Sequence, residues 1–190
     1  MKRVIIVHGW GGFPEEGWFP WLKKELEAKD FIVEAPQLPD TDNPRIEKWV
    51  PKLAEVAGTP DENTYFVGHS MGCQTIARYL ETLPEDVKIG GAIFVAGFFT
   101  LLTGIEPEEK KIEKHWMETP IDLKKVKLHL IKSVALFSDD DSYVPLDNQD
   151  DFRTKLGSEI IVQHKMNHFL GSKGITELPI VLEKILEMAK

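Results

Sequence analysis

Gly68-His69-Ser70-Met71-Gly72 is the stretch of this sequence that decides the expected fold. It follows an apolar run at 65–67 that predicts a strand, and it precedes a pattern at 73–83 that predicts a helix. A serine between two glycines at such a turn is strained and holds its hydroxyl above the sheet edge, because side chains at the two glycine positions would collide there. The stretch therefore predicts a strand–turn–helix unit and makes Ser70 a candidate nucleophile.

The rest of the chain alternates short apolar runs with helical patterns. The apolar runs predict strands at 3–7, 31–35, 64–67, 91–95, 133–137 and 159–163. The helical patterns lie near 20–29, 45–57, 71–83, 146–156 and 177–189. Because most of the strands are apolar at successive positions, they are expected to be buried on both faces. We therefore predict one α/β domain over 1–190, with a doubly wound, mostly or wholly parallel six-stranded sheet and helices on both faces.

The segment 98–120 departs from this alternation. It is longer than a plain connection and combines apolar residues with a polar helical stretch at 107–117. One interpretation is a small cap over the site beyond the strand ends, and the other is an ordinary crossover helix with a long lead-in. The domain is thus expected to carry, at most, a small cap excursion at 98–120.

The composition limits the classes of partner. The net charge is -8, with 31 acidic and 23 basic residues, which argues against nucleic acid and anionic membranes as partners. The apolar run at 4–7 is too short for a signal peptide, and no stretch approaches the ~20 apolar residues of a membrane span. The only cysteine, Cys73, cannot form an internal disulfide, so a cytoplasmic location is expected.

A serine hydroxyl is a weak nucleophile that needs a base, and the base needs an orienting acid. In a doubly wound sheet both should follow the carboxyl ends of strands. The run Asp139-Asp140-Asp141 follows the fifth predicted strand, and Asp140 and Asp141 are the acid candidates. Three successive carboxylates point in different directions, which argues against a metal site. His168 lies in the loop beyond the last predicted strand, whereas His164 stands at the strand end, so His168 is the expected base.

The negative charge that develops on a substrate oxygen requires backbone donors. Met71, directly after the nucleophile, supplies one N–H at the start of its helix. The Gly-rich loop His8-Gly9-Trp10-Gly11-Gly12 follows the first strand, and Trp10 is expected to supply the second N–H. This loop matches neither dinucleotide-binding nor P-loop spacing, so no nucleotide is expected.

With these motifs the chain resembles the α/β-hydrolase superfamily. More specifically, it is similar to the small serine hydrolases related to retinoblastoma-binding protein nine. The resemblance covers nearly the whole chain and rests on the segments 7–12, 36–39 with Trp49 downstream, 68–72, 138–145 and 167–169. It implies Ser70, Asp141 and His168 as a catalytic triad, with Asp141 three residues before the valine of a Val-Pro pair. The Leu-x-Cys-x-Glu motif of one family member is absent, so its retinoblastoma-type partner is not expected here.

The expected function is that of a serine hydrolase, carboxylesterase-like, that cleaves a small ester, thioester or amide through an acyl-enzyme intermediate. It needs no cofactor and no metal, and its partner is a small acyl substrate. A peptidase or a thioesterase of the same fold is the alternative within this class. A binding protein that retains the fold without turnover is the alternative from another class, because fold does not imply function.

Overall fold

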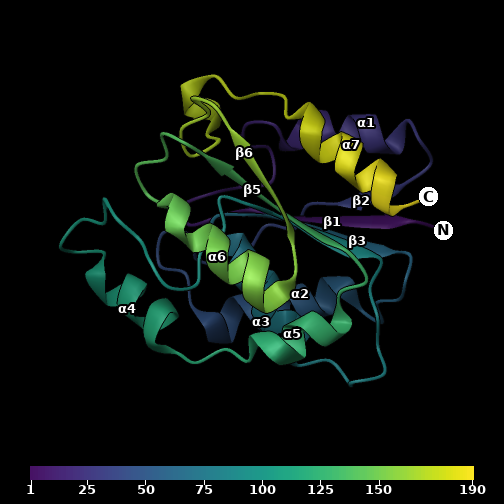
Figure 1. The fold of residues 1–190 in the computed structure, drawn as a ribbon, viewed down its shortest axis with the longest axis horizontal. Helices are drawn as coiled ribbons and strands as arrows, with labels where there is room; N and C mark the ends of the chain where they lie inside the picture. Colours follow the sequence, from purple (N-terminus) through teal and green to yellow (C-terminus); the bar gives the residue numbers. More distant parts are fainter.

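The computed structural model describes all residues from 1 to 190 and contains one six-stranded sheet (Figure 1). The strands lie in the order β2-β1-β3-β4-β5-β6 and all of their pairings are parallel. They are β1 (Arg3–Val7), β2 (Ile32–Glu34), β3 (Thr64–His69), β4 (Gly91–Val95), β5 (Ser133–Ser138) and β6 (Glu159–Gln163). The predicted fold class, a doubly wound and wholly parallel sheet, is confirmed.

The burial of the strands explains their sequences. Every residue of β3 and β4 is buried, since these central strands are covered on both faces. The edge strands are less covered, and Ile32 of β2 and Val162 of β6 are each 45% exposed. The apolar runs of the sequence therefore mark the centre of the sheet, and the mixed runs mark its edges.

Helices cover both faces of the sheet (Figure 1). On one face α1 (Phe19–Glu27) packs beside α7 (Pro179–Met188) over a core of 21 buried residues. On the other face α2 (Ile46–Ala57), α3 (Met71–Glu81) and α5 (Leu123–His129) lie over a core of 26 buried residues. Two separate cores are the expected result of right-handed crossovers on alternate sides of a parallel sheet.

The strand order places a topological switch point between β1 and β3. The chain leaves β1 toward β2 on one side, and β3 pairs with β1 on the other side, with Val7 opposite Gly68. The loops after β1 and β3 consequently lie next to each other at the carboxyl edge. Such a crevice is where ligands of open α/β sheets bind.

Two segments differ from the predicted elements. Helix α5 was not predicted, because its seven residues are too few for a clear amphipathic pattern; its sequence signal is the cap at Asp122, whose carboxylate accepts the N–H groups of Lys124 and Lys125. The helix predicted at 146–156 changes hydrogen bonding along its length.

That second segment consists of a 3₁₀ turn at Leu146–Asn148, α6 (Gln149–Asp151) and a π-helical turn at Phe152–Leu156. The fully buried Phe152 ring packs against Phe94, Phe99 and Phe137. The carbonyl of Phe152 also accepts the N–H of Ser158 at 3.0 Å. A wide last turn thus lets one ring fill the core and lets the chain enter β6.

The 98–120 segment contains α4 (Lys110–Glu118), whose end is fixed to the domain. The buried Arg78 of α3 donates to the carbonyls of Trp116 and Thr119, both at 2.8 Å. Trp116 is fully buried, and its indole N–H donates to the Pro44 carbonyl at 3.0 Å. The function of this segment as a cap stays a prediction.

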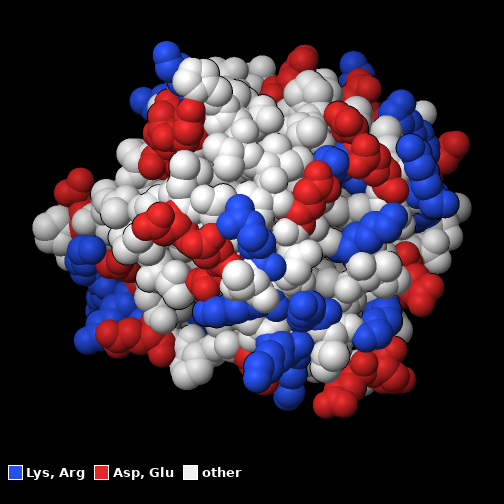
Figure 2. Space-filling model, in the orientation of Figure 1, with Lys and Arg blue, Asp and Glu red and all other residues white.

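Charged side chains of both signs are spread over the face shown in Figure 2. Lys and Arg gather over α5 and over the helical turn that follows α6, and acidic side chains are scattered among and around them. No helix of this structure combines the length and the apolar character that crossing a membrane requires.

Candidate active site

The turn between β3 and α3 holds Ser70 in a strained backbone conformation. Its φ of 54° and ψ of -120° lie in a region that L-residues rarely adopt. The two glycines make the turn possible: a Cβ on Gly68 would lie 2.9 Å from the Cα of Cys73, and a Cβ on Gly72 would lie 2.2 Å from the Val7 carbonyl oxygen. The Ser70 hydroxyl makes no hydrogen bond within the protein.

The loop after β1 lies against this turn. A Cβ on Gly9 would be only 3.0 Å from the Cβ of Ser70, so the loop backbone approaches the serine closely. The Trp10 N–H makes no hydrogen bond within the protein, while the next two N–H groups of the loop donate to Thr41 and Gly9 carbonyls. Met71 is the first residue of α3, where a helix leaves its N–H groups without partners. Both predicted donors, Trp10 and Met71, therefore lie beside Ser70.

The structure joins Asp141 to His168. The Nδ1 of His168 donates to Oδ2 of Asp141 at 2.8 Å, and the two side chains are 9% and 2% exposed. The other carboxylate oxygen of Asp141 accepts the N–H groups of Tyr143 and Val144, at 2.8 and 3.0 Å. Because these bonds fix the carboxylate, it holds the imidazole with the proton on Nδ1 and leaves Nε2 as an acceptor.

The other two aspartates have different partners. Asp140 accepts the Asn167 N–H and the Ser138 hydroxyl, both at 2.7 Å. Asp139 accepts the Lys165 N–H at 2.8 Å and binds the ring of His164. The loop before His168 is thus held by two successive carboxylates. No group of three or more His, Cys, Asp or Glu side chains in the structure is arranged to hold a metal ion.

This loop needs such support because its backbone is strained. Lys165, Asn167 and Phe169 all have positive φ values, between 51° and 56°. Residues other than glycine adopt this conformation only when neighbouring contacts stabilise it. Hydrogen bonds from this segment to Asp139, Asp140 and Asp141, in the loop after β5, therefore determine where His168 lies.

The ring of His69 packs against the ring of His168, the candidate base. It is 3% exposed, its ring lies 4.9 Å from the ring of His168, and its Nε2 donates to the His168 carbonyl at 2.8 Å. Burial, together with the neighbouring His168, lowers the pKa of His69 to about 3. His69 is therefore neutral at physiological pH and holds the His168 backbone without adding a charge.

The buried His69 predicts a pH dependence of stability. Between pH 6.5 and pH 3 the unfolded chain binds a proton on this residue and the folded chain does not, so the free energy of unfolding falls as the pH falls through this range. Replacing His69 with Gln should reduce the loss of unfolding free energy between pH 6.5 and 4.5 by roughly 2–3 kcal/mol. Urea unfolding at both pH values measures it. Equal losses in wild type and His69→Gln would contradict the assignment.

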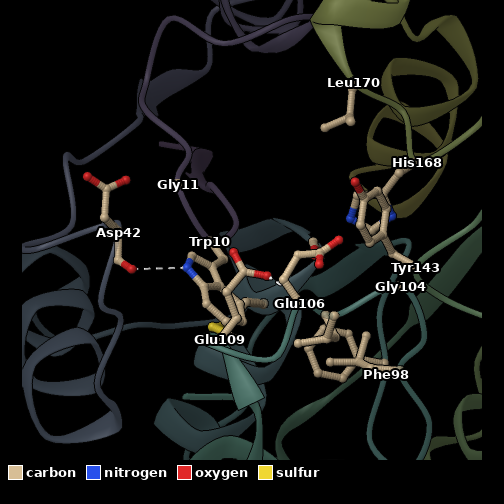
Figure 3. Close-up of a pocket in the computed structure, with 14 residues that line it drawn as sticks. Trp10, Gly11, Asp42, Phe98, Gly104, Glu106, Glu109, Tyr143, His168 and Leu170 are labelled. Atoms are coloured by element: carbon tan, nitrogen blue, oxygen red, sulfur yellow. Dashed lines mark hydrogen bonds between the residues drawn. The ribbon is translucent and has the colours of Figure 1, made fainter. Parts of the chain in front are cut away.

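A cavity of about 460 Å³ opens in front of these residues (Figure 3). Ser70, Met71 and His168 line one part of it. Its apolar lining comes from Trp10, Phe98, Leu102, Ile105 and Leu170. This volume lies within the range of small-molecule sites, roughly 300–1,000 Å³. The sites predicted after three different strands thus converge on one cavity.

Sequence reasoning did not identify several residues of the site. His69 lies in the stretch 68–72, and its position directly before Ser70 was the signal that the sequence offered. Tyr143, whose ring lies 5.2 Å from that of His168, had no signal beyond its place after Asp141. Asp42, Glu106 and Glu109 line the cavity from loops that carry no motif. His164, the second base candidate, is 74% exposed and does not line the cavity.

Known proteins resemble this chain in sequence and in fold. A family model described as serine hydrolase matches residues 4–187. The chain belongs to the serine hydrolase family. The resemblance drawn from the sequence motifs is therefore confirmed.

Relatives of this serine hydrolase cover nearly its whole length. YdeN of Bacillus subtilis strain 168, which is named as a hydrolase, is 32% identical over 182 residues, covering 96% of this chain and 93% of YdeN. The crystal structure of the ydeN gene product superposes with a TM-score of 0.90 over 99% of this chain and 98% of that one. The rat serine hydrolase RBBP9 is 26% identical over 190 residues, covering 98% and 97% of the two chains. Est1E of Butyrivibrio proteoclasticus, solved with ferulic acid, shares the fold at 16% identity, a TM-score of 0.76 and coverage of 99% and 89%.

Cys73 lies close behind Ser70, and its thiol is unreactive. It is fully buried, and its thiol donates to the Val95 carbonyl at 3.4 Å. Burial raises the pKa of the thiol well above its usual value. The thiol therefore stays protonated and acts as a small core residue.

Proposed function

We propose that this serine hydrolase cleaves small carboxylic esters through an acyl-enzyme intermediate on Ser70, with His168 as the base and Asp141 as its orienting acid. The observation that carries the proposal is the 2.8 Å hydrogen bond between the buried side chains of Asp141 and His168, beside a cavity that Ser70 also lines. A serine with a free hydroxyl, a base and a fixed acid are the groups that acyl transfer requires.

The first half of the reaction forms the acyl-enzyme. The Ser70 oxygen attacks the carbonyl carbon of the ester while its proton passes to Nε2 of His168, and the carbonyl electrons move onto the oxygen. The N–H groups of Trp10 and Met71 stabilise that oxyanion, each contribution being worth about 10²–10³ in rate. The intermediate collapses, and the departing alcohol takes the proton from His168.

The second half releases the acid. Water replaces the alcohol and gives a proton to His168 as its oxygen attacks the acyl carbon. Collapse of the second tetrahedral intermediate breaks the bond to Ser70, which recovers its proton from His168. Asp141 remains ionised throughout, since its function is to orient the ring and stabilise the imidazolium.

The size of the cavity supports a small ester as the substrate. A volume of about 460 Å³ holds a short acyl chain and a compact alcohol, and its apolar lining favours both. Thioesters and amides use the same groups and remain the alternatives within the class. Binding without turnover is the alternative from another class; the strained Ser70 argues against it, because strain is retained where a function requires it.

A panel of p-nitrophenyl esters of increasing acyl length tests the proposal. We expect hydrolysis of short to medium chains, with roughly two to eight carbons, and a steep decline beyond them because the cavity cannot hold more. Mass spectrometry after treatment with a fluorophosphonate should locate the adduct on Ser70. A folded wild-type protein that neither turns over any ester nor takes up the fluorophosphonate would overturn the proposed function.

A further inference from the structure

One wall of the cavity carries negative charge only. Asp42, Glu106 and Glu109 line it, and no Lys or Arg does. Glu106 and Glu109 project from the lead-in to α4, between Trp10 on one side and Tyr143 and His168 on the other (Figure 3). The charged wall thus belongs to the 98–120 segment and to the loop that precedes α2.

These three carboxylates have no ion-pair partner. Thirteen ion pairs occur in the structure and none includes Asp42, Glu106 or Glu109, although neighbouring Lys110 pairs with Glu113. The Glu109 carboxylate accepts only the Glu106 N–H, at 3.3 Å, and the indole of Trp10 donates to the backbone of Asp42 and not to its carboxylate. Their charges are therefore uncompensated, and they are not grouped so as to hold a metal ion.

The candidate base borders the same cavity as the acidic wall. His168 is 8% exposed, yet its Nε2 has no hydrogen-bond partner within the protein and the residue lines the cavity. Because this nitrogen is not among the buried unpaired side-chain atoms, it is accessible to a ligand or water in the cavity. The charged wall and this unpaired nitrogen border the same space, so one ligand can meet both.

We propose that the cavity selects esters whose acyl chain ends in a permanent or protonated ammonium group. The ester carbonyl lies at Ser70, the methylene chain lies along Phe98 and Leu102, and the cation lies against Glu106 and Glu109. Unpaired carboxylates in a concave site focus the field, attract cations and repel anions. This inference rests on the proposed function, since it defines the substrate of the same site.

Three matched p-nitrophenyl esters test the selection. They are the 4-(trimethylammonio)butanoate, its uncharged isostere 5,5-dimethylhexanoate, and the anionic glutarate monoester. At low ionic strength we expect kcat/KM to be about tenfold higher for the cation than for the isostere, and lower again for the anion. The cation preference should shrink in 0.5 M NaCl because salt screens a partly exposed charge.

Substitutions of Glu106 and Glu109 test whether the acidic wall causes the preference for the cationic ester. The double variant Glu106→Gln/Glu109→Gln should bring the ratio of cationic to isosteric kcat/KM close to one. The matched control is Glu108→Gln, an exposed glutamate of the same segment that does not line the cavity, and it should keep the wild-type ratio. Equal rates for cation and isostere in wild type, or an unchanged ratio in the double variant, would overturn the inference.

A binding measurement separates this inference from the proposed function. Calorimetric titration with butyltrimethylammonium requires no turnover, and we expect salt-sensitive binding to wild type that the double variant loses. Ester hydrolysis without cation preference or cation binding would leave the function standing and refute the selection. Cation binding by a protein that hydrolyses no ester would support the acidic wall as a cation site and refute the proposed function.

Discussion

The Ser70→Ala variant is expected to lose about 10⁵-fold or more in kcat on a p-nitrophenyl ester and to take up no fluorophosphonate. Without the hydroxyl there is no acyl-enzyme, and the oxyanion donors alone provide only residual catalysis. Initial rates at saturating ester concentration measure the loss of kcat. Intact-protein mass after fluorophosphonate treatment measures the loss of uptake. A variant that keeps more than a hundredth of the wild-type kcat would exclude Ser70 as the nucleophile.

The stability of the same variant serves as its control. The Ser70 hydroxyl makes no hydrogen bond within the protein, so Ser70→Ala should unfold at nearly the wild-type urea concentration. Ser70→Gly should be inactive as well but more stable than Ser70→Ala by about 1 kcal/mol. Glycine relieves a backbone strain of about 1–3 kcal/mol at φ 54°, which its greater freedom in the unfolded chain only partly offsets.

The Asp141→Asn variant is expected to lose about 10⁴-fold in kcat while remaining folded. The amide oxygen can still accept the N–H groups of Tyr143 and Val144, which directs the amide NH₂ toward Nδ1 of His168. An NH₂ at that position favours the tautomer protonated on Nε2, which cannot accept the Ser70 proton. Steady-state kinetics with circular dichroism of the folded variant measures the effect.

The neighbouring aspartate provides the matched comparison. In Asp140→Asn the amide oxygen can still accept the Asn167 N–H and the Ser138 hydroxyl, so kcat should fall by about tenfold at most. The two substitutions are at adjacent positions and make the same chemical change. If Asp140→Asn proved the more damaging of the two, Asp141 would lose its assignment as the acid.

Much of the fold was predictable from local patterns. All six strands were located, because the central strands are buried on both faces and read as continuous apolar runs. The glycines at 68 and 72 indicated the tight turn for a steric reason that acts between near neighbours. Helix α5 and the π-helical turn at Phe152–Leu156 were not predictable in this way, because a cap of one residue and the packing of one aromatic ring determine them.

By itself the sequence determined the strand–turn–helix unit around Ser70, the order of nucleophile, acid and base candidates, and the parallel sheet that places them at one edge. Only the tertiary structure shows which group each of the three aspartates binds, because each carboxylate has a partner in the 164–168 loop, more than 20 residues away. It alone brought Glu106, Glu109 and Asp42 to the wall of one cavity. Local sterics can be read along a chain, whereas the partner of a side chain depends on which segments the fold brings together.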